Sequence, residues 1–127
     1  MLKDSHAFSG FSVDDVSKAK DFYGGTLGVD VAEEMGGLRL NLGSGTSVFL
    51  YPKDNHQAAT YTVLNFPVQN VEDAVDKLTS AGVQLELYEG FEQDERGIAH
   101  GDGQEPDIAW FKDPAGNILS VLSGDPS

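Results

Sequence analysis

One sequence pattern occurs twice in this chain of 127 residues, and it limits the folds that the chain can adopt. The segment FSVDDVSKA at residues 11–19 has a counterpart in FPVQNVEDA at residues 66–74, where Phe, Val, Val and Ala recur at matching places. Farther on, residues 27–29 are echoed by residues 81–83 after the loss of one residue. A period of this length exceeds that of common solenoid repeats. The pattern therefore predicts one domain made of two similar modules.

The first copy predicts a β-α-β-β-β unit. Asp14 and Asp15 can cap a short amphipathic helix, and the paired glycines Gly24 and Gly25 are expected to end it. Alternation of apolar and polar side chains, broken by glycine-rich turns, predicts the strands of this unit. These strands are expected at residues 6–13, 29–33, 38–42 and 47–51.

The second copy predicts the same order of elements. Asn70 is the candidate cap of its helix, and Gly82 is expected to close that helix. Strands are expected to follow at residues 84–88, 108–111 and 118–122. We therefore predict an α+β fold in which module one covers about residues 5–52, a polar connector about 53–59 and module two about 60–123.

The segment at residues 108–122 reads as a β-hairpin closed by a turn that contains Pro114 and Gly116. Pro114 fixes one backbone dihedral of the turn, and Gly116 or Asn117 can take a positive φ angle. Both faces of the second strand are mostly apolar, so we expect it to be covered on both sides. Ser120 is the polar exception in this strand. The presence of a serine at this position is the main functional clue in the sequence.

The charge balance narrows the range of partners. The chain has 8 Lys+Arg against 21 Asp+Glu, a formal net charge of −13, and no Cys. Such a chain repels phosphate backbones and anionic membranes, so neither nucleic acid nor a membrane is an expected partner, whereas a cationic ligand would be attracted. The acidity can equally serve solubility alone. No apolar run approaches the roughly 20 residues that span a bilayer, and we expect a cytoplasmic location.

The two βαβββ units, the segment FSVDDVSKAKDFYGGTLGV and the closing FKDPAGNILSVL together resemble the vicinal oxygen chelate superfamily. That superfamily includes glyoxalase I, the extradiol dioxygenases, fosfomycin resistance enzymes and bleomycin resistance proteins. The resemblance implies that each unit curls around a cup and that two units enclose a cavity. In the metalloenzymes, His, Gln or Glu side chains reach into the cavity from the first and last strand of each unit and hold a divalent metal.

The resemblance can be carried over to the four positions of these metal ligands. Counting back from the Val that precedes each helix gives Phe8 and Val63 on the first strands. Counting forward from the glycine of each closing turn gives Phe49 and Ser120 on the last strands. Three of these side chains cannot bind a metal, and a lone neutral hydroxyl is a poor ligand. We therefore expect no metal cofactor at the usual place, while a divalent metal held by displaced ligands stays an alternative.

Without the metal, the cup can still bind a small molecule, because apolar walls with a few polar groups are typical of ligand pockets. Each candidate can equally be a core residue, although an inward-facing Asn65 needs a hydrogen-bond partner. Aromatic candidates such as Trp110 could stack on a flat or cationic group. By alternation along the strands and by their aromatic character, the candidate ligand-binding residues are Phe8, Phe49, Tyr51, Tyr61, Val63, Asn65, Trp110 and Ser120.

The longest irregular stretch, at residues 88–107, is a candidate lid or a solvated acidic loop. If the protein has a general acid or base, Asp94, Glu95 or His100 of this stretch, or His56 of the connector, is its expected source. No spacing in the sequence points to a nucleophile with its base. The catalytic residues are therefore left unassigned.

Two functions of different classes follow. The first is a metal-free protein, similar to bleomycin resistance proteins, that binds a small molecule, cationic or aromatic, in a cavity between its modules. The second is a glyoxalase-like lyase, isomerase or dioxygenase that uses displaced metal ligands or a metal-free acid–base pair, and it rests on analogy of fold alone. The resemblance also leads us to expect a homodimer, since βαβββ units can pair within a chain or between two chains.

Overall fold

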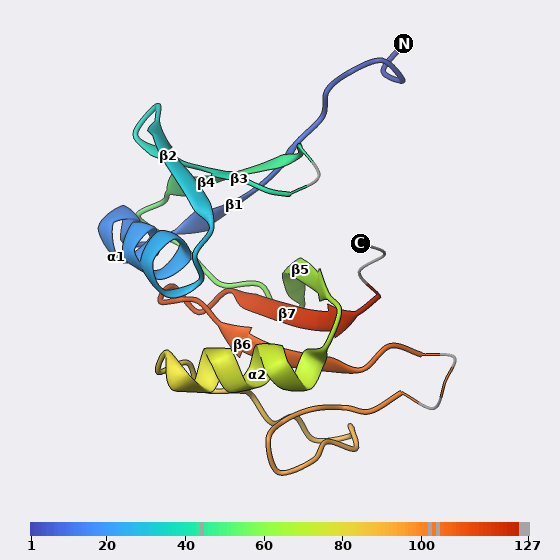
Figure 1. Cartoon of the computed structure of the whole chain (residues 1–127). Coiled ribbons are helices and arrows are strands. Elements are labelled where there is room, and N and C mark those ends of the chain that lie inside the picture. Colours follow the sequence, from blue (N-terminus) through green and yellow to red (C-terminus); the bar gives the residue numbers. More distant parts are fainter. Residues whose placement is uncertain (44, 102, 104, 125–127) are drawn as a thin grey trace. The chain divides into compact units, whose positions relative to one another are not determined.

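Residues 1–43, 45–101, 103 and 105–124 are described by the computed structural model. The chain divides into two compact units, Met1–Ala58 and Ala59–Ser127, which we call module one and module two. Each module contains one small mixed sheet and one main helical segment, so the predicted α+β fold of two βαβββ modules is confirmed (Figure 1).

In module one, the part of the chain that the structure describes forms four strands in the spatial order β1-β4-β3-β2. β1 runs parallel to β4, whereas β3 is antiparallel to both of its neighbours. Alternate strand residues turn toward the helical side, where Val13, Leu38, Leu40 and Leu50 are fully buried together with Tyr23. The strands are β1 (Ser9–Val13), β2 (Asp30–Glu34), β3 (Gly37–Asn41) and β4 (Ser47–Pro52).

The helical segment of module one begins as predicted but continues farther than predicted. The carboxylate of Asp15 accepts a hydrogen bond from the N–H of Lys18 and caps α1 (Val16–Lys20). The chain then widens into the π-helix η1 (Asp21–Thr26), so the prediction that Gly24 and Gly25 end the helix was wrong. In the wider turn the N–H of Leu27 reaches back five residues to Phe22, and this keeps both glycines in the helix.

The described residues of module two form three strands in the order β5-β7-β6, with β7 parallel to β5 and antiparallel to β6. The helix α2 (Val71–Ser80) packs on one face of this sheet (Figure 1). Its buried side chains Val71, Val75 and Leu78 lie four and three residues apart, which is the spacing of one helix face. The predicted cap Asn70 accepts a hydrogen bond from Asp73, which confirms that prediction. The strands are β5 (Thr62–Val68), β6 (Ile108–Lys112) and β7 (Ile118–Ser123).

The strand predicted at residues 84–88 does not form, and that prediction was wrong. Only Leu85 makes a bridge, to Phe111, and the N–H of Glu86 donates to the carbonyl of Trp110 over 2.8 Å. Farther along β6, a different segment takes the outer edge, because Ala99 and Ile108 exchange two backbone hydrogen bonds of 2.8 and 3.0 Å. Two short segments therefore share the place that β2 fills in module one.

The closing hairpin forms as predicted. The carboxylate of Asp113 accepts hydrogen bonds from the N–H groups of Ala115 and Asn117, both at 2.9 Å. Gly116 takes the positive φ angle, at 86°. Because Asp113 and Asn117 are both buried, these hydrogen bonds satisfy polar groups that have lost their water.

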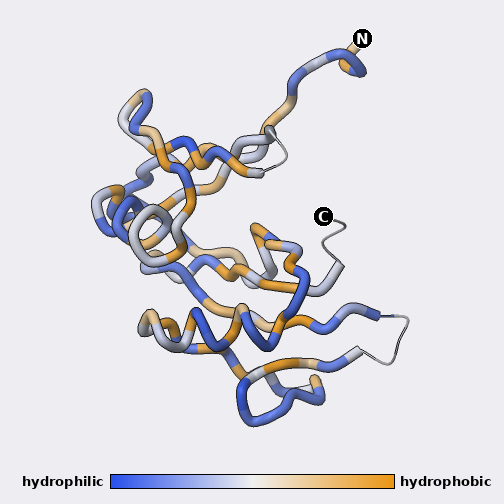
Figure 2. Tube along the Cα trace, in the orientation of Figure 1, coloured by the Kyte–Doolittle hydropathy of each residue, from blue (hydrophilic) through white to orange (hydrophobic). Residues whose placement is uncertain are grey.

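The hydropathy of the residues varies along the trace. Apolar residues recur along the strands, whereas the stretch at residues 92–96 of module two is uniformly polar (Figure 2). Among the described residues, none of the helices has both the length and the apolar character needed to cross a bilayer.

Candidate functional site

One face of the module-two sheet carries a row of three predicted site residues. Register places Asn65 of β5 and Trp110 of β6 on either side of Ser120 of β7. The Ser120 hydroxyl donates to the side-chain oxygen of Asn65 over 2.5 Å. Ser120 is fully buried and Asn65 is exposed, so the row runs from a shielded hydroxyl to an accessible amide.

Trp110 is the centre of an aromatic cluster on this face. The ring of Tyr88 meets it edge-on with centroids 5.6 Å apart, and the ring of Phe91 lies 5.2 Å away at a tilt of 54°. Such edge-to-face and tilted contacts are favourable arrangements for aromatic side chains. Trp110 remains half-buried and Phe91 is exposed, so the cluster presents accessible aromatic surface next to the Ser120–Asn65 pair.

The surroundings of the aromatic cluster keep the hydroxyl group of Tyr88 neutral. Burial, and then the negative charge of Glu86, raise the pKa of Tyr88 above its ordinary value. Glu86 in turn lies 3.6 Å from the ammonium group of Lys112. The Tyr88 hydroxyl has no hydrogen-bond partner in the described part of the chain, so the cluster keeps one unused donor.

Module one has an aromatic face of its own. The rings of Phe49 and Tyr51 stack with centroids 6.4 Å apart and an interplanar angle of 20°. Gly10 of β1 is in register with Phe49 of β4. A Cβ at this glycine would come within 2.9 Å of the Phe49 carbonyl oxygen. Phe8, just before β1, is 66% exposed.

The connector brings one predicted catalytic candidate to module one. Nδ1 of His56 lies 2.6 Å from the hydroxyl oxygen of Ser12 on β1, and both residues are half-buried. Ser12 was not among the predicted site residues, because 44 residues of sequence separate it from His56. Only the return of the connector across β1 makes them neighbours.

The irregular stretch at residues 88–107 brings together two other candidates. Nε2 of His100 lies 2.8 Å from the carboxylate of Asp94, and Nδ1 lies 3.9 Å from Asp107. For Asp94, desolvation opposes ionisation, but hydrogen bonds from His100, Ile98 and Arg96 outweigh it and lower the pKa of Asp94. The hydrogen bond with Asp94 raises the pKa of His100. The pair therefore favours its charged form.

Part of the same stretch is held to the rest of module two, while other described residues of it, such as Glu92 and Glu95, are exposed. Arg96 forms ion pairs with Asp76 and Glu72 of α2. Ile98 is fully buried. The His100–Asp94 pair lies within this same stretch and is not part of the aromatic cluster around Trp110.

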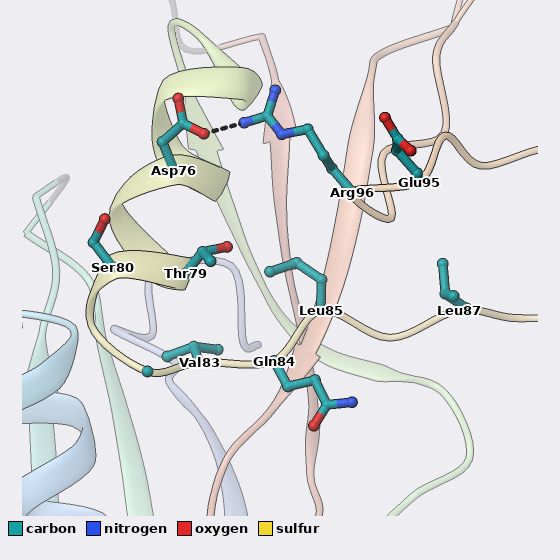
Figure 3. Close-up of a pocket in the computed structure, with 10 residues that line it drawn as sticks. Asp76, Thr79, Ser80, Val83, Gln84, Leu85, Leu87, Glu95 and Arg96 are labelled. Atoms are coloured by element: carbon teal, nitrogen blue, oxygen red, sulfur yellow. Dashed lines mark hydrogen bonds and ion pairs between the residues drawn. The ribbon is translucent and has the colours of Figure 1, made fainter.

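A groove of about 670 Å³ lies on the helix side of module two (Figure 3). Figure 3 shows α2 on one side and the segment with Leu85 and Leu87 on the other, and the ion pair of Asp76 with Arg96 joins α2 to the segment that carries Glu95. The predicted catalytic candidate Glu95 is part of this lining, whereas His100 is not. Because the described lining has neither His nor an aromatic side chain, the groove offers no imidazole base and no stacking surface.

Two predicted ligand-binding residues stay outside these clusters. Tyr61 lies just before β5 and is 69% exposed, and Val63 is half-buried at an irregularity of the β5–β7 pairing. Sequence reasoning missed Tyr88 and Phe91 as site residues. The signal that could have identified them was the presence of two aromatic residues in an otherwise polar, acidic stretch.

Comparison with known proteins settles the family. The model of the Glyoxalase/Bleomycin resistance protein/Dioxygenase superfamily matches residues 6–121. The chain belongs to this superfamily. None of the curated proteins compared with the chain matches it.

Solved structures of the superfamily share the fold over nearly the whole chain. FosX, a fosfomycin resistance protein of Listeria monocytogenes, superposes with a TM-score of 0.71 at 15% identity, covering 94% of this chain and 93% of its own. A glyoxalase family protein of Enterococcus faecalis gives 0.70 at 21% identity, with 96% and 99% covered. Lactoylglutathione lyase of Agrobacterium tumefaciens gives 0.69 at 16% identity, with 96% of each chain covered. At such identities the likeness establishes the fold alone.

The usual metal positions of the superfamily fit a metal poorly in this chain. The Ser120 hydroxyl is already engaged with Asn65, the Phe49 ring stacks on Tyr51, and Phe8 and Val63 carry no donor atom. Among the described residues, no group of three or more His, Asp or Glu side chains could hold a metal ion. The donor set at these positions therefore does not match the ligands that the superfamily resemblance implies.

Proposed function

We propose that this superfamily member binds a flat small molecule, aromatic or cationic, at the face of the module-two sheet that carries Asn65, Ser120 and Trp110, without the usual metal ligands. The observation that carries the proposal is the row of Asn65, Ser120 and Trp110, in which a neutral hydrogen-bonded pair stands beside an aromatic cluster. A flat ring could stack on Trp110 while a polar group of the ligand meets the amide of Asn65.

The amide of Asn65 gives this site its polarity. Its oxygen accepts the Ser120 hydroxyl, and a side-chain amide also has two N–H donors. Because Asn65 is exposed, those donors can be offered to a ligand that carries an acceptor, such as a carbonyl or a ring nitrogen. The aromatic rings supply the apolar contact, and the amide supplies orientation.

The charge of the chain supports a cationic ligand over an anionic one. A formal net charge of −13 attracts cations from solution, and aromatic faces add a cation–π contribution of about 0.5–2 kcal/mol. Glu86 lies close to Tyr88 and strengthens the negative potential there. The ligand is expected to be neutral or positively charged.

The fluorescence of Trp110 gives a direct test, because this is the only Trp of the chain. Titration with a quinolinium salt and with uncharged quinoline is expected to quench or shift the Trp110 emission with saturation. Tetraethylammonium chloride tests whether a positive charge without a ring is enough for binding, and benzoate tests whether an anionic ring binds. Asn65→Leu is expected to weaken quinoline binding about tenfold, the effect of one lost hydrogen bond. Asn55→Leu, at an exposed position of the connector, is the matched control. Unsaturable quenching, or equal affinity of both variants, would contradict the proposal.

The second function, a glyoxalase-like lyase, isomerase or dioxygenase, has one observation in its favour. The His100–Asp94 pair is an acid–base pair at 2.8 Å, although it lies apart from the aromatic cluster. Elemental analysis of the purified protein distinguishes the two functions. Stoichiometric Ni, Zn, Mn or Fe that is lost in His100→Gln would favour the enzyme with displaced ligands and contradict metal-free binding.

The proposal also includes a homodimer, a cytoplasmic location and a cavity between the modules, each of which stays a prediction. Light scattering of the purified protein measures the first, and fractionation of expressing cells measures the second. A structure determined with quinoline bound tests the third.

A further inference from the structure

Ser12 and His56 form a pair with the geometry of a nucleophile and its base. The Ser12 hydroxyl oxygen lies 2.6 Å from Nδ1 of His56, at the short end of the range for such pairs. Both residues are half-buried, so water does not fully surround the hydrogen bond. The pair lies entirely in module one and shares no residue with the site of the proposed function.

Backbone hydrogen bonds place the imidazole over β1. The N–H of Lys53 donates to the carbonyl of Val13 over 3.0 Å, which fastens the start of the connector to the residue after Ser12. The N–H of His56 then donates to the carbonyl of Lys53, also over 3.0 Å, and closes a turn. These two backbone hydrogen bonds, one made by Lys53 and one by His56, therefore help to hold His56 in place beside its contact with Ser12.

Aromatic surface lies beside the pair. Ser12 is in register with Tyr51 of the parallel strand β4, and the Tyr51 ring stacks on Phe49. Tyr51 is 39% exposed, so part of this surface is accessible. A flat leaving group next to the Ser12 hydroxyl would find an apolar wall there.

From this arrangement we infer that Ser12 is a nucleophile, activated by His56, that accepts the acyl group of small aryl esters. Ser12 Oγ forms a bond to the acyl carbon while its proton passes to Nδ1 of His56. The acyl–oxygen bond to the aryl group breaks, and the aryloxide takes that proton and leaves as a phenol. Water then hydrolyses the acyl-serine by the same proton transfers in reverse. The first step requires a neutral imidazole with its own proton on Nε2.

The other role for the same hydrogen bond is structural, since it also ties the connector to β1. A structural bond requires no reactivity of Ser12 toward an ester, whereas a nucleophile must become acylated. Reaction with an activated ester therefore separates the two roles.

The experiment uses p-nitrophenyl acetate with the full chain, and it measures nitrophenolate release and the position of the acetyl group by peptide mass mapping. We expect about one acetyl group per chain, on Ser12, formed in a burst. His56→Gln is expected to slow the burst about 100-fold, which is the contribution of a general base. Ser9→Ala, at the exposed first residue of β1, and His6→Gln, at an exposed position before it, are the matched controls and should leave the burst unchanged.

Acetyl groups found on lysine or tyrosine only would overturn the inference, as would a burst of equal size in Ser12→Ala. The mapping on the unaltered chain decides the question even if Ser12→Ala does not fold. Quinoline binding at Trp110 is measured separately, so failure of this inference and failure of the proposed function are distinguishable.

Discussion

Nε2 of Gln93 donates a hydrogen bond over 2.9 Å to the carbonyl oxygen of Glu86. At Glu86 the pairing between the segment that carries this residue and β6 stops. The same nitrogen donates to Gly97 over 2.8 Å, and Oε1 accepts the N–H of Tyr88 over 2.7 Å. One side-chain amide thus joins the two segments that share the outer edge of β6. It also fixes the backbone of Tyr88, whose ring contacts Trp110.

Replacement of Gln93 is therefore expected to loosen this part of module two. Gln93→Leu removes three hydrogen bonds and should lower the free energy of unfolding by about 2–3 kcal/mol, at about 1 kcal/mol for each bond. Urea unfolding measures the loss, and hydrogen exchange should show faster exchange at the Tyr88 amide. Gln84→Leu, at an exposed position, is the control and should change neither quantity. Unchanged exchange at Tyr88 in Gln93→Leu would show that the amide does not hold the segment.

The burial of Ser120 predicts a difference between two substitutions. Ser120→Ala leaves the exposed Asn65 able to bond with water, so we expect a loss of only about 1 kcal/mol. Ser120→Glu places a carboxylate at a fully buried position and should cost about 3 kcal/mol or more. Urea unfolding compares both with Ser9→Ala. Equal stability of the Glu and Ala variants would mean that this position is more open than the structure has it.

The close backbone contact at Gly37 predicts that replacing this glycine lowers the stability of the protein. A Cβ at Gly37 would overlap the carbonyl oxygen of Leu50 on the neighbouring strand. Gly37→Ala should therefore lower the free energy of unfolding by about 2 kcal/mol, because the strand must shift. Gly43→Ala has open space around the added methyl and should be neutral or slightly stabilising. Similar unfolding midpoints for both variants would refute the contact.

The His100–Asp94 pair predicts a stability difference that depends on pH. The pKa of His100 is raised in the folded protein, so its contribution is present below the ordinary histidine pKa and is lost as the pH rises through the raised value. The pKa of Asp94 is lowered, so its contribution is present above the ordinary aspartate pKa and is lost as the pH falls through the lowered value. The pair therefore stabilises most between these limits, at about pH 5–6.

Thermal unfolding of the unaltered chain and of His100→Gln at about pH 5.5 and pH 8.5 measures this difference. The gap in melting temperature should be wider at the lower pH, and His6→Gln, at an exposed terminal position, should show no such trend. A gap that widens as the pH rises would contradict the assigned sign.

Much of the fold could be predicted because the signals are local. The duplicated segment predicted the order of elements in module one and, apart from the strand expected at residues 84–88, in module two. The caps at Asp15 and Asn70 begin the helices where the sequence indicated. Strand alternation also placed Asn65 and Ser120 on one face, because a period of two leaves no other choice once the strands pair.

The sequence by itself thus determined most of the elements, the caps that begin the helices and the side of each strand on which a side chain lies. Only the tertiary structure decided which segments reach the edge of β6, that Gln93 joins them, and that His56 returns to Ser12. The physical reason is that these hydrogen bonds form between groups whose proximity depends on loop closure and strand register, which no local residue pattern encodes.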